Sequence, residues 1–371
     1  MNQCRTGLYI HIPFCSKRCK YCDFFSLETS DSGVIREYGK KVIDTIFSRI
    51  DEFEGEFSTV YIGGGSPSML PSSFFDQFQE EVLSTKKFKN IKEFTVEINP
   101  ADIDRTWLGV LSEKGVNRIS VGIQAMDDRV LSEMGRRTKV ADIKKNLPVI
   151  SKLFQNISVD FIYGLGEKRD IRKEFCEVFE LADIKHVSAY QYTRPERENA
   201  PLLISEEETI KQETEIREFL YAGGFEKYEI SNYSKNGHRS LHNMIYWSYG
   251  SWLGIGAGAH SFNCKTGEHS FYQPDIAEFI NGAGLSRFST SKRELMEEFL
   301  LMGLRTADGI NLNKFRRFFD VSFEDVFSLD VIKDLERNEL IKSDESSILC
   351  TEKGFDLLDS VLLKIFESGK K

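Results

Sequence analysis

The sequence predicts an α/β protein in which a partial, TIM-like (β/α)6 barrel is followed by a C-terminal winged-helix-like α+β module. Two observations lead to this prediction. Through the first half of the chain, short runs rich in β-branched residues alternate with longer amphipathic segments, a pattern typical of βα units around a parallel sheet. From Lys292 onward the pattern changes to three helices, a short hairpin and a last helix.

The barrel is predicted from its strands and from the helical segments between them. Strands are expected where short apolar runs recur, at Leu8–Ile12, Thr59–Ile62, Phe94–Ile98, Arg118–Val121, Ser158–Ile162 and His186–Tyr190. Helices are expected at the amphipathic segments near Val34–Ile50, Ser72–Leu83, Thr106–Glu113, Val140–Leu153 and Arg172–Leu181. Binding and catalytic residues of parallel α/β folds gather at the carboxyl ends of the strands, so we expect the functional site there.

Beyond residue 200 the alternation ends. Ser205–Tyr221 is predicted to be a charged helix with Ser205 as its N-cap and Glu208 completing a capping box. Residues 228–262 are dense in aromatic residues and glycine, and residues 263–291 resemble a connecting stretch. We therefore divide the chain into a barrel at residues 1–200, a barrel-extending segment at residues 201–291, and a C-terminal module at residues 292–371.

The composition argues against several classes of function. The 371 residues carry 49 basic and 58 acidic side chains, a net charge of −9, whereas nucleic-acid-binding proteins usually have a basic surplus. No run of about 18 uncharged apolar residues is present to span a membrane, and the N-terminus lacks the apolar core of a secretory signal. We expect a soluble, cytoplasmic protein, in which clustered cysteines indicate metal or redox chemistry rather than disulfides.

Three of the seven cysteines lie close together directly after the first predicted strand. Cys15, Cys19 and Cys22 have C-x3-C-x2-C spacing, which lets three thiolates converge on one inorganic centre. Cysteine thiolates hold iron–sulfur clusters, and a [4Fe–4S] cluster with only three such ligands keeps one iron open. A zinc site would need a fourth Cys or His, and the nearby His11 lies inside the strand. The loop therefore predicts a [4Fe–4S] cluster.

The cysteine motif resembles that of radical S-adenosylmethionine (SAM) enzymes, where it follows the first strand. The segment Tyr9–Cys15 is similar to the subgroup that contains oxygen-independent coproporphyrinogen III oxidases and HemW-type haem chaperones. The likeness extends through nearly the whole chain, including the C-terminal module. It implies a barrel of the radical SAM type and a [4Fe–4S] cluster whose open iron is chelated by SAM.

Polar residues at the ends of the other strands fit such a site. Gly63–Pro67 follows the second strand, where glycines let the backbone approach a ligand closely. Glu97, Gln124 and Asp160 are polar side chains in apolar strands, and burying them is costly unless they are paired. Hydrogen bonds inside the barrel would explain each one alone, but all three on one rim favour a ligand. The resemblance implies that SAM is bound by Tyr9, Gly64, Gly65, Ser66, Glu97, Gln124, Arg136 and Asp160.

Two features favour the haem chaperones over the decarboxylating oxidases. Oxidases of the family typically carry a fourth cysteine two residues after the third, where this chain has Phe24. They also carry an N-terminal extension before the cysteine loop, whereas only 14 residues precede Cys15 here. In addition, His242–Trp247 matches the H-N-x-x-Y-W motif of HemW-type proteins.

The segment 242–247 is the predicted haem site. Imidazole is a standard axial ligand of haem iron, and aromatic side chains offer flat apolar surface to a porphyrin. If the segment is helical, Tyr246 lies one turn from His242 on the same face. A histidine beside aromatic residues is more often a packed core residue, but the family match favours His242 as a haem ligand.

The main hypothesis is a haem chaperone that carries the cluster and exchangeable SAM and passes haem to an acceptor haemoprotein, with a respiratory protein as one candidate acceptor. Two alternatives stay open: an oxygen-independent coproporphyrinogen III oxidase that forms protoporphyrinogen IX, and a radical SAM enzyme with an unrelated substrate. Whether the protein is an enzyme is left open, and no catalytic residue is assigned. The resemblance also raises the expectation of a homodimer.

Overall fold

Six parallel strands form the centre of the molecule. The computed structural model describes residues 5–196 and 199–369. The six strands lie side by side in chain order and confirm the predicted runs: β1 (Thr6–Ile12), β4 (Phe57–Gly64), β5 (Glu93–Ile98), β6 (Arg118–Gln124), β7 (Ile157–Tyr163) and β8 (His186–Gln191). Parallel sheets are covered on both faces, which explains why most residues of these strands are buried, polar ones included.

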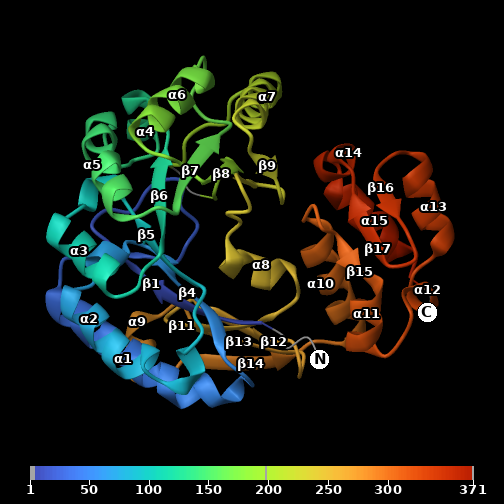
Figure 1. Cartoon of the computed structure of the whole chain (residues 1–371), viewed down its shortest axis with the longest axis horizontal. Helices are drawn as coiled ribbons and strands as arrows, with labels where there is room; N and C mark the ends of the chain where they lie inside the picture. The colour runs from blue at the N-terminus through green and yellow to red at the C-terminus, as the bar shows by residue number, and fades with distance from the viewer. Residues whose placement is uncertain (1–4, 197–198, 370–371) are drawn as a thin grey trace.

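Helices cover the outer face of this sheet (Figure 1). They fall on the predicted amphipathic segments: α1 (Ser32–Arg49), α2 (Ser72–Gln77), α3 (Arg105–Glu113), α5 (Val140–Leu153) and α6 (Ile171–Leu181). α2 continues as a π-helix over Phe78–Leu83, and the short α4 (Asp128–Glu133) precedes α5. Aspartate side chains accept hydrogen bonds from first-turn amides at the starts of α1, α3, α4 and α6. These βα units confirm the partial (β/α)6 barrel.

The sheet extends beyond the barrel at both edges. β11 (Ser251–Ile255) pairs in parallel with β1 and is followed by the antiparallel strands β12 (His260–Asn263), β13 (Glu268–Tyr272) and β14 (Leu285–Ser289). At the other edge, β10 (Asn232–Ser234) and β9 (Glu226–Lys227) follow β8. The expectation that residues 263–291 form a connecting stretch is wrong, because they hold β13, β14 and α9 (Ile276–Ile280).

Two helices link the barrel to its extension. α7 (Glu206–Ala222) matches the predicted charged helix, and the Ser205 side chain caps it by accepting a hydrogen bond from the Glu208 amide. α8 (Leu241–Trp247) contacts β1, β4 and β11, and it also contacts α10 (Lys292–Leu304). The predicted haem motif is therefore helical, and its helix lies between the sheet and the C-terminal module.

The C-terminal module has the predicted order of helices followed by a hairpin and a final helix. After α10 come β15 (Ile310–Asn311), α11 (Leu312–Phe319), α12 (Phe323–Val326), α13 (Leu329–Arg337), β16 (Ile341–Ser343), β17 (Ser347–Cys350), α14 (Glu352–Asp356) and α15 (Leu358–Glu367). The strands form a small sheet in the order β15-β17-β16. The winged-helix-like α+β prediction is confirmed, but β15 is an additional strand, a fourth helix precedes the hairpin and two helices rather than one follow it.

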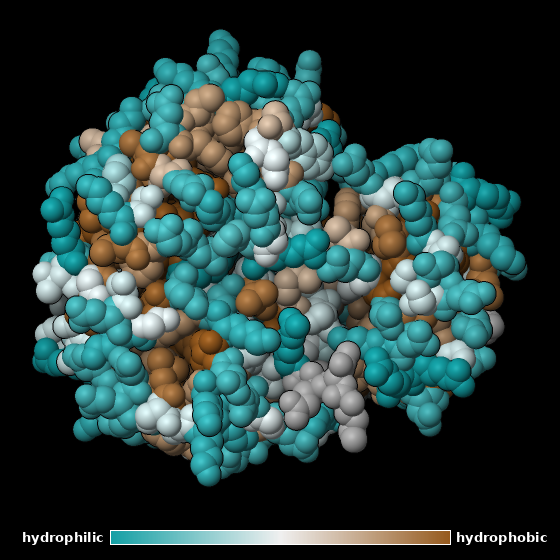
Figure 2. Space-filling view, in the orientation of Figure 1, coloured by the Kyte–Doolittle hydropathy of each residue, from teal (hydrophilic) through white to brown (hydrophobic). Residues whose placement is uncertain are grey.

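The apolar core is divided between the barrel and the module. One buried cluster fills the barrel and its surrounding helices, and a second fills the module, where it includes Tyr249 from the turn after α8 and Phe262 from β12. Figure 2 shows a furrow between these two bodies on the viewed face. Among the described residues, no helix is long and apolar enough to cross a membrane.

Candidate functional site

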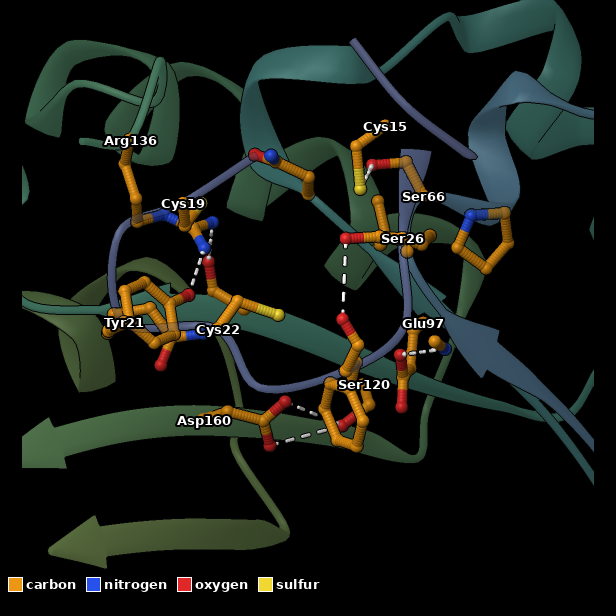
Figure 3. Close-up of a pocket in the computed structure, with 18 of the residues that line it drawn as sticks. Cys15, Cys19, Tyr21, Cys22, Ser26, Ser66, Glu97, Ser120, Arg136 and Asp160 are labelled. Carbon is orange, nitrogen blue, oxygen red and sulfur yellow. Dashed lines mark hydrogen bonds between the residues drawn. The ribbon is translucent and has the colours of Figure 1, made fainter. Parts of the chain in front are cut away.

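A cavity of about 330 Å³ opens at the carboxyl ends of the parallel strands. Its wall is formed by the loop that carries the three cysteines and by the ends of β4 to β8. In Figure 3 the cysteine loop lies on one side of the cavity, and Glu97, Ser120 and Asp160 lie on the opposite side. This is the rim at which parallel α/β folds bind their ligands, as the sequence predicted.

The backbone holds the cysteine loop at both ends. β2 (Phe14–Cys15) pairs with β3 (Leu27–Glu28) on the far side of the loop, and the Thr29 amide donates to the Cys15 carbonyl at 3.1 Å. In the middle, the Lys20 amide donates to the Met134 carbonyl at 2.8 Å. Because the loop is fixed at these points, Cys15, Cys19 and Cys22 all line the cavity.

The donor set fits a cluster better than a single metal ion. Among the described residues, no group of three or more His, Cys, Asp or Glu side chains is placed to hold one ion. The thiols of a three-cysteine cluster bind three different irons, so they need not approach one another as closely as ligands of a single ion do. Three partly exposed thiols on one cavity wall are consistent with that arrangement.

The glycine loop after β4 packs directly against the cysteine loop. The Gly65 amide donates to the Ile12 carbonyl at 2.7 Å, and the Ser66 amide donates to the Phe14 carbonyl at 2.7 Å. A Cβ atom at Gly65 would lie 2.6 Å from the Phe14 carbonyl oxygen and 3.0 Å from the Cys15 sulfur. Glycine is therefore required for this close approach.

Glu97, the second-to-last residue of β5, has its carboxylate bound to the neighbouring strand. The Tyr61 hydroxyl donates to Oε1 at 2.7 Å, and the Gly64 amide donates to Oε2 at 3.0 Å. Burial nevertheless raises the pKa of the Glu97 carboxyl to about 7, and the nearby Asp160 contributes to the rise. Glu97 therefore changes its charge close to neutral pH.

The remaining predicted SAM residues of β6 and β7 meet around the same space. Asp160 accepts a hydrogen bond from the Ser120 hydroxyl at 3.2 Å, and burial raises the pKa of its carboxyl. Gln124 ends β6 with a φ of 69° after an irregularity in the register with β7, and this positive φ is uncommon for a residue with a side chain.

Arg136 closes the wall between the strands and the cysteine loop. Its Nη1 donates to the Tyr21 hydroxyl at 2.8 Å, and its Nη2 donates to the Gly122 carbonyl at 2.7 Å. Its Nε is buried and has no hydrogen-bond partner among the described residues. Such an orphaned donor is rare in a folded protein unless a ligand or water completes it.

Seven of the eight predicted SAM residues thus line the cavity: Gly64, Gly65, Ser66, Glu97, Gln124, Arg136 and Asp160. Tyr9 lies behind this wall, because its hydroxyl is bound to His11 Nδ1 at 2.9 Å and its ring is next to Tyr61 and His242.

His242 lies inside the barrel rather than on the cavity wall. Its side chain is buried, with the residue 1% exposed. Nδ1 is hydrogen-bonded to Thr59 Oγ1 at 2.8 Å, and Nε2 is hydrogen-bonded to the Tyr246 hydroxyl at 2.6 Å. Burial lowers the pKa of the imidazole to about 3, so the ring is neutral. In this arrangement a haem iron would reach His242 only after one of these bonds breaks.

Several residues of the cavity wall were not predicted from the sequence. They share an inward position on the barrel strands: Tyr61, Arg118, Ser120, Ser188 and Tyr190. The signal that would have found them is alternation, since Arg118, Ser120, Gly122 and Gln124 occupy every second position of β6 and therefore point to one face.

Each of the two parts of the chain matches the sequence model of a known family. The sequence model of the radical SAM superfamily matches residues 9–179, and that of the HemN C-terminal domain matches residues 290–357. Coproporphyrinogen III oxidase (HemN) from Escherichia coli, described as a radical SAM enzyme, superposes with a TM-score of 0.80 over 98% of this chain and 90% of that one. At 20% identity, this match shows a shared fold.

Curated relatives match along almost the entire chain. The heme chaperone HemW of Lactococcus lactis is 31% identical and covers 98% of both chains. The heme chaperone HemW of Bacillus subtilis is 30% identical over 93% of this chain and 95% of its own length. With the three cysteines, the glycine loop and the polar strand ends assembled around one cavity, the chain belongs to the HemW family of radical SAM proteins.

Proposed function

We propose that this protein binds haem and transfers it to an acceptor haemoprotein. The observation that carries the proposal is the similarity to curated HemW heme chaperones over nearly the full length of both chains. Phe24 supports it, because the residue in the position of the oxidases' fourth cysteine is an exposed aromatic side chain on the cavity wall.

We assign Cys15, Cys19 and Cys22 as ligands of a [4Fe–4S] cluster, and the cavity beside them as the site of exchangeable SAM. When bound, the cluster supplies an open iron and one electron to the SAM sulfonium. Glu97 and Asp160 would provide negative charge to the cationic groups of SAM. Arg136 Nε, which has no hydrogen-bond partner among the described residues, would offer a donor to an anionic group. Gly64, Gly65 and Ser66 would hold the cofactor's amino-acid end close to the cysteine loop.

The proposed SAM site depends on the charge of Glu97. In the cofactor-free cavity its carboxyl has a pKa of about 7, and a bound cation would lower that value by favouring the charged form. SAM binding should therefore release a fraction of a proton near neutral pH, and Tyr61 and Gly64 keep the carboxylate in place in both states.

The second candidate function is oxygen-independent coproporphyrinogen III oxidase. One observation favours it: the polar wall expected for SAM, from Gly64 to Asp160, is complete apart from Tyr9. Both candidate functions are proposed with the same cluster and SAM site, so measurements on the porphyrin distinguish them.

The proposal is tested with the full-length protein reconstituted anaerobically with iron and sulfide. Haemin is titrated and the Soret band is recorded, the haem-loaded protein is mixed with an apo-haemoprotein, and coproporphyrinogen III turnover is assayed in the same preparation. We expect haem binding and transfer without decarboxylation. Robust formation of protoporphyrinogen IX would overturn the chaperone proposal, as would the absence of any haem binding.

The cluster assignment has its own test. Cys19→Ala should lose the broad iron–sulfur absorbance of the reconstituted protein, because a three-ligand cluster has no spare thiolate. Cys176→Ser is the matched control, since Cys176 is an exposed free cysteine on α6 outside the cavity wall. Iron and sulfide analysis should give a full cluster in the control, and retention of a full cluster in Cys19→Ala would refute the assignment.

A further inference from the structure

The six histidines of the chain differ sharply in whether a ring nitrogen is available to a metal. His11, His186 and His242 are buried, and both nitrogens of each ring are hydrogen-bonded. His11 is bound by Tyr9 and the Phe25 carbonyl. His186 is bound by Ser158 and Tyr228 at 2.7 Å each, in the same manner as His242. None of these three rings presents a free lone pair.

The other three histidines are at least partly exposed. His269 Nε2 is paired with a carboxylate oxygen of Glu298 at 3.1 Å. No side-chain hydrogen bond joins His238 or His260 to another described residue, but only His260 is stacked on an aromatic ring. Among the described residues, His260 is therefore the histidine that combines a solvent-exposed, unpaired imidazole with an aromatic surface.

His260 begins β12 within a patch of aromatic rings on the sheet extension. Its ring stacks on Phe271 of β13, with centroids 5.2 Å apart and an interplanar angle of 16°. The ring centroid of Phe288 of β14 lies 6.2 Å from that of Phe271, and the Phe288 ring stacks on His269 with centroids 5.2 Å apart. Phe288 is 47% exposed. We call these four residues, His260, His269, Phe271 and Phe288, the His–Phe patch.

The His–Phe patch lies on the face of the sheet that carries α8. Phe262 is two residues beyond His260 and therefore shares its face. Its ring packs against Trp252 of β11 with ring centroids 5.2 Å apart, and Trp252 packs against Tyr246 of α8 with centroids 4.8 Å apart. β12, β13 and β14 lie in the lower part of the view in Figure 1, below α8. The patch thus continues the inner face of the barrel outward to solvent.

The cysteine loop reaches the same end of the sheet extension. Gly258, two residues before His260, has a φ of 81°, and a Cβ atom placed there would lie 3.2 Å from the Cβ of Phe25. Phe25 follows the cysteine loop, and its carbonyl is bound by His11. The start of β12 is therefore packed against the segment that carries the proposed cluster ligands.

We propose that His260 is the axial ligand through which haem binds this protein, with Phe271 and Phe288 supplying apolar surface to the porphyrin. The inference rests on the proposed haem-carrier function and assigns its ligand. Ligation of a ferric haem by histidine needs one open imidazole nitrogen on the protein. An exposed site suits haem that must be handed on to another protein. Coordination at His242 would instead require α8 to leave its place in the barrel.

The ionisation of His260 agrees with this assignment. Partial burial lowers the pKa of its imidazole, and the neighbouring His269 lowers it further. A neutral imidazole at pH 7 binds iron without first losing a proton. Among the described residues, the titratable group that acts on this ring is His269, which is in turn paired with Glu298.

The test titrates haemin into the full-length protein and records the Soret band and the electron paramagnetic resonance spectrum of the ferric complex. His260→Gly should lose the histidine-ligated spectrum and bind haemin at least about tenfold more weakly. Added imidazole should restore the spectrum, because it fills the space vacated by the side chain. His238→Ala is the control, and it should bind haemin as the wild type does. Phe271→Ala should weaken binding several-fold while keeping the histidine-ligated spectrum.

The outcomes separate this inference from the function on which it rests. A wild-type protein that binds no haemin overturns the haem-carrier function. Haem binding with an unchanged spectrum in His260→Gly overturns the assignment of His260 alone. Loss of the histidine-ligated spectrum in His242→Ala but not in His260→Gly would place the ligand on α8 and show that this helix moves.

Discussion

Glu97 is a site residue whose buried surroundings change the pH at which it carries charge. A carboxyl with a pKa of about 7 in the folded protein binds its proton more tightly there than in the unfolded chain, where the ordinary value is 4.5. The folded state therefore holds more protons between these two values, and stability falls as pH rises through that window. The charged form costs the cofactor-free protein free energy at neutral pH and above.

Glu97→Gln should remove this dependence, because the amide resembles the protonated acid and does not titrate. We expect the variant to match the wild type near pH 4.5 and to exceed it at about pH 8 by on the order of 2 kcal/mol. The measurement is the unfolding midpoint of cofactor-free protein across that range. Parallel pH profiles for the two proteins would show that Glu97 titrates in its ordinary range.

Gly64 has a backbone conformation and a close contact that no residue with a side chain can adopt without strain. Its φ is +107°, and a Cβ atom there would lie 2.5 Å from the His11 ring. Gly64→Ala should lower the free energy of unfolding by roughly 1–3 kcal/mol and weaken SAM binding by displacing the loop. Gly115→Ala separates the two causes, because Gly115 has a φ of +85° with nothing within 4 Å. Urea denaturation should show a smaller loss, about 1 kcal/mol, and unchanged SAM affinity.

The sequence predicted those site residues that can be recognised from residue type and spacing alone. The cysteine spacing, the glycine turn and the lone carboxylates could be recognised without knowing which residues contact them in the fold. Arg118 could not, because an arginine at the start of a strand normally lies at the surface, and only closure of the barrel buries it to 2% exposure. The environment of His242 was equally hidden, since Thr59 and Glu93 are far from it in the sequence.

At the scale of elements, α8 is held in place by a buried carboxylate. The Glu93 side chain at the start of β5 accepts hydrogen bonds from the Leu241 and His242 amides at 2.8 and 2.9 Å. These amides have no partner within a helix, so the acceptor from β5 fixes where α8 begins. The start of α8 therefore places the His242 side chain beside Thr59 in the protein without ligand.

Glu93→Ala should leave both amides buried without an acceptor and lower the free energy of unfolding by about 2–4 kcal/mol. Hydrogen exchange of the α8 amides should accelerate more than that of α1. Glu113→Ala is the control, because Glu113 is exposed at the end of α3, and its stability should stay within about 0.5 kcal/mol of the wild type. Unchanged exchange in α8 after Glu93→Ala would contradict this account.

The sequence predicted elements well where one periodicity ran uninterrupted. Val140–Leu153 was predicted and observed with the same limits despite Pro148, because its apolar spacing is strongly helical. The extension over β12 to β14 was missed because its strands mix polar and aromatic residues. Ser270 and Ser261, for example, are buried beside Phe262, so alternation of hydrophobicity gives no clear signal there.

At the scale of the whole molecule, the barrel and the C-terminal module are joined at Arg305. Its guanidinium lies 3.7 Å from the centre of the Trp247 ring and is paired with the fully buried Glu229 at 3.0 Å. An isolated Glu–Arg–Trp contact on the surface would contribute little, but burial of Glu229 makes its loss costly.

Arg305→Ala should destabilise the join by about 2–4 kcal/mol, because it leaves a buried carboxylate without its cation. In differential scanning calorimetry we expect the module to unfold at a lower temperature than the barrel, and limited proteolysis to cut between them. Arg337→Ala provides the comparison, since Arg337 is exposed on α13 of the same module. A single transition that is shifted equally in both variants would argue against a specific role for Arg305.

The pairing of β1 with β11 joins residues that are far apart in the chain, since Thr6 lies opposite Ser251. Contacts of such long range form slowly because a large loop must close first. At ribosomal rates of 5–20 residues per second, roughly 10 to 50 s separate the emergence of these two strands. Cys15, Cys19 and Cys22 follow β1 directly, so during synthesis these thiols meet the cell's oxidants and metals well before the strand that completes the barrel beside them exists.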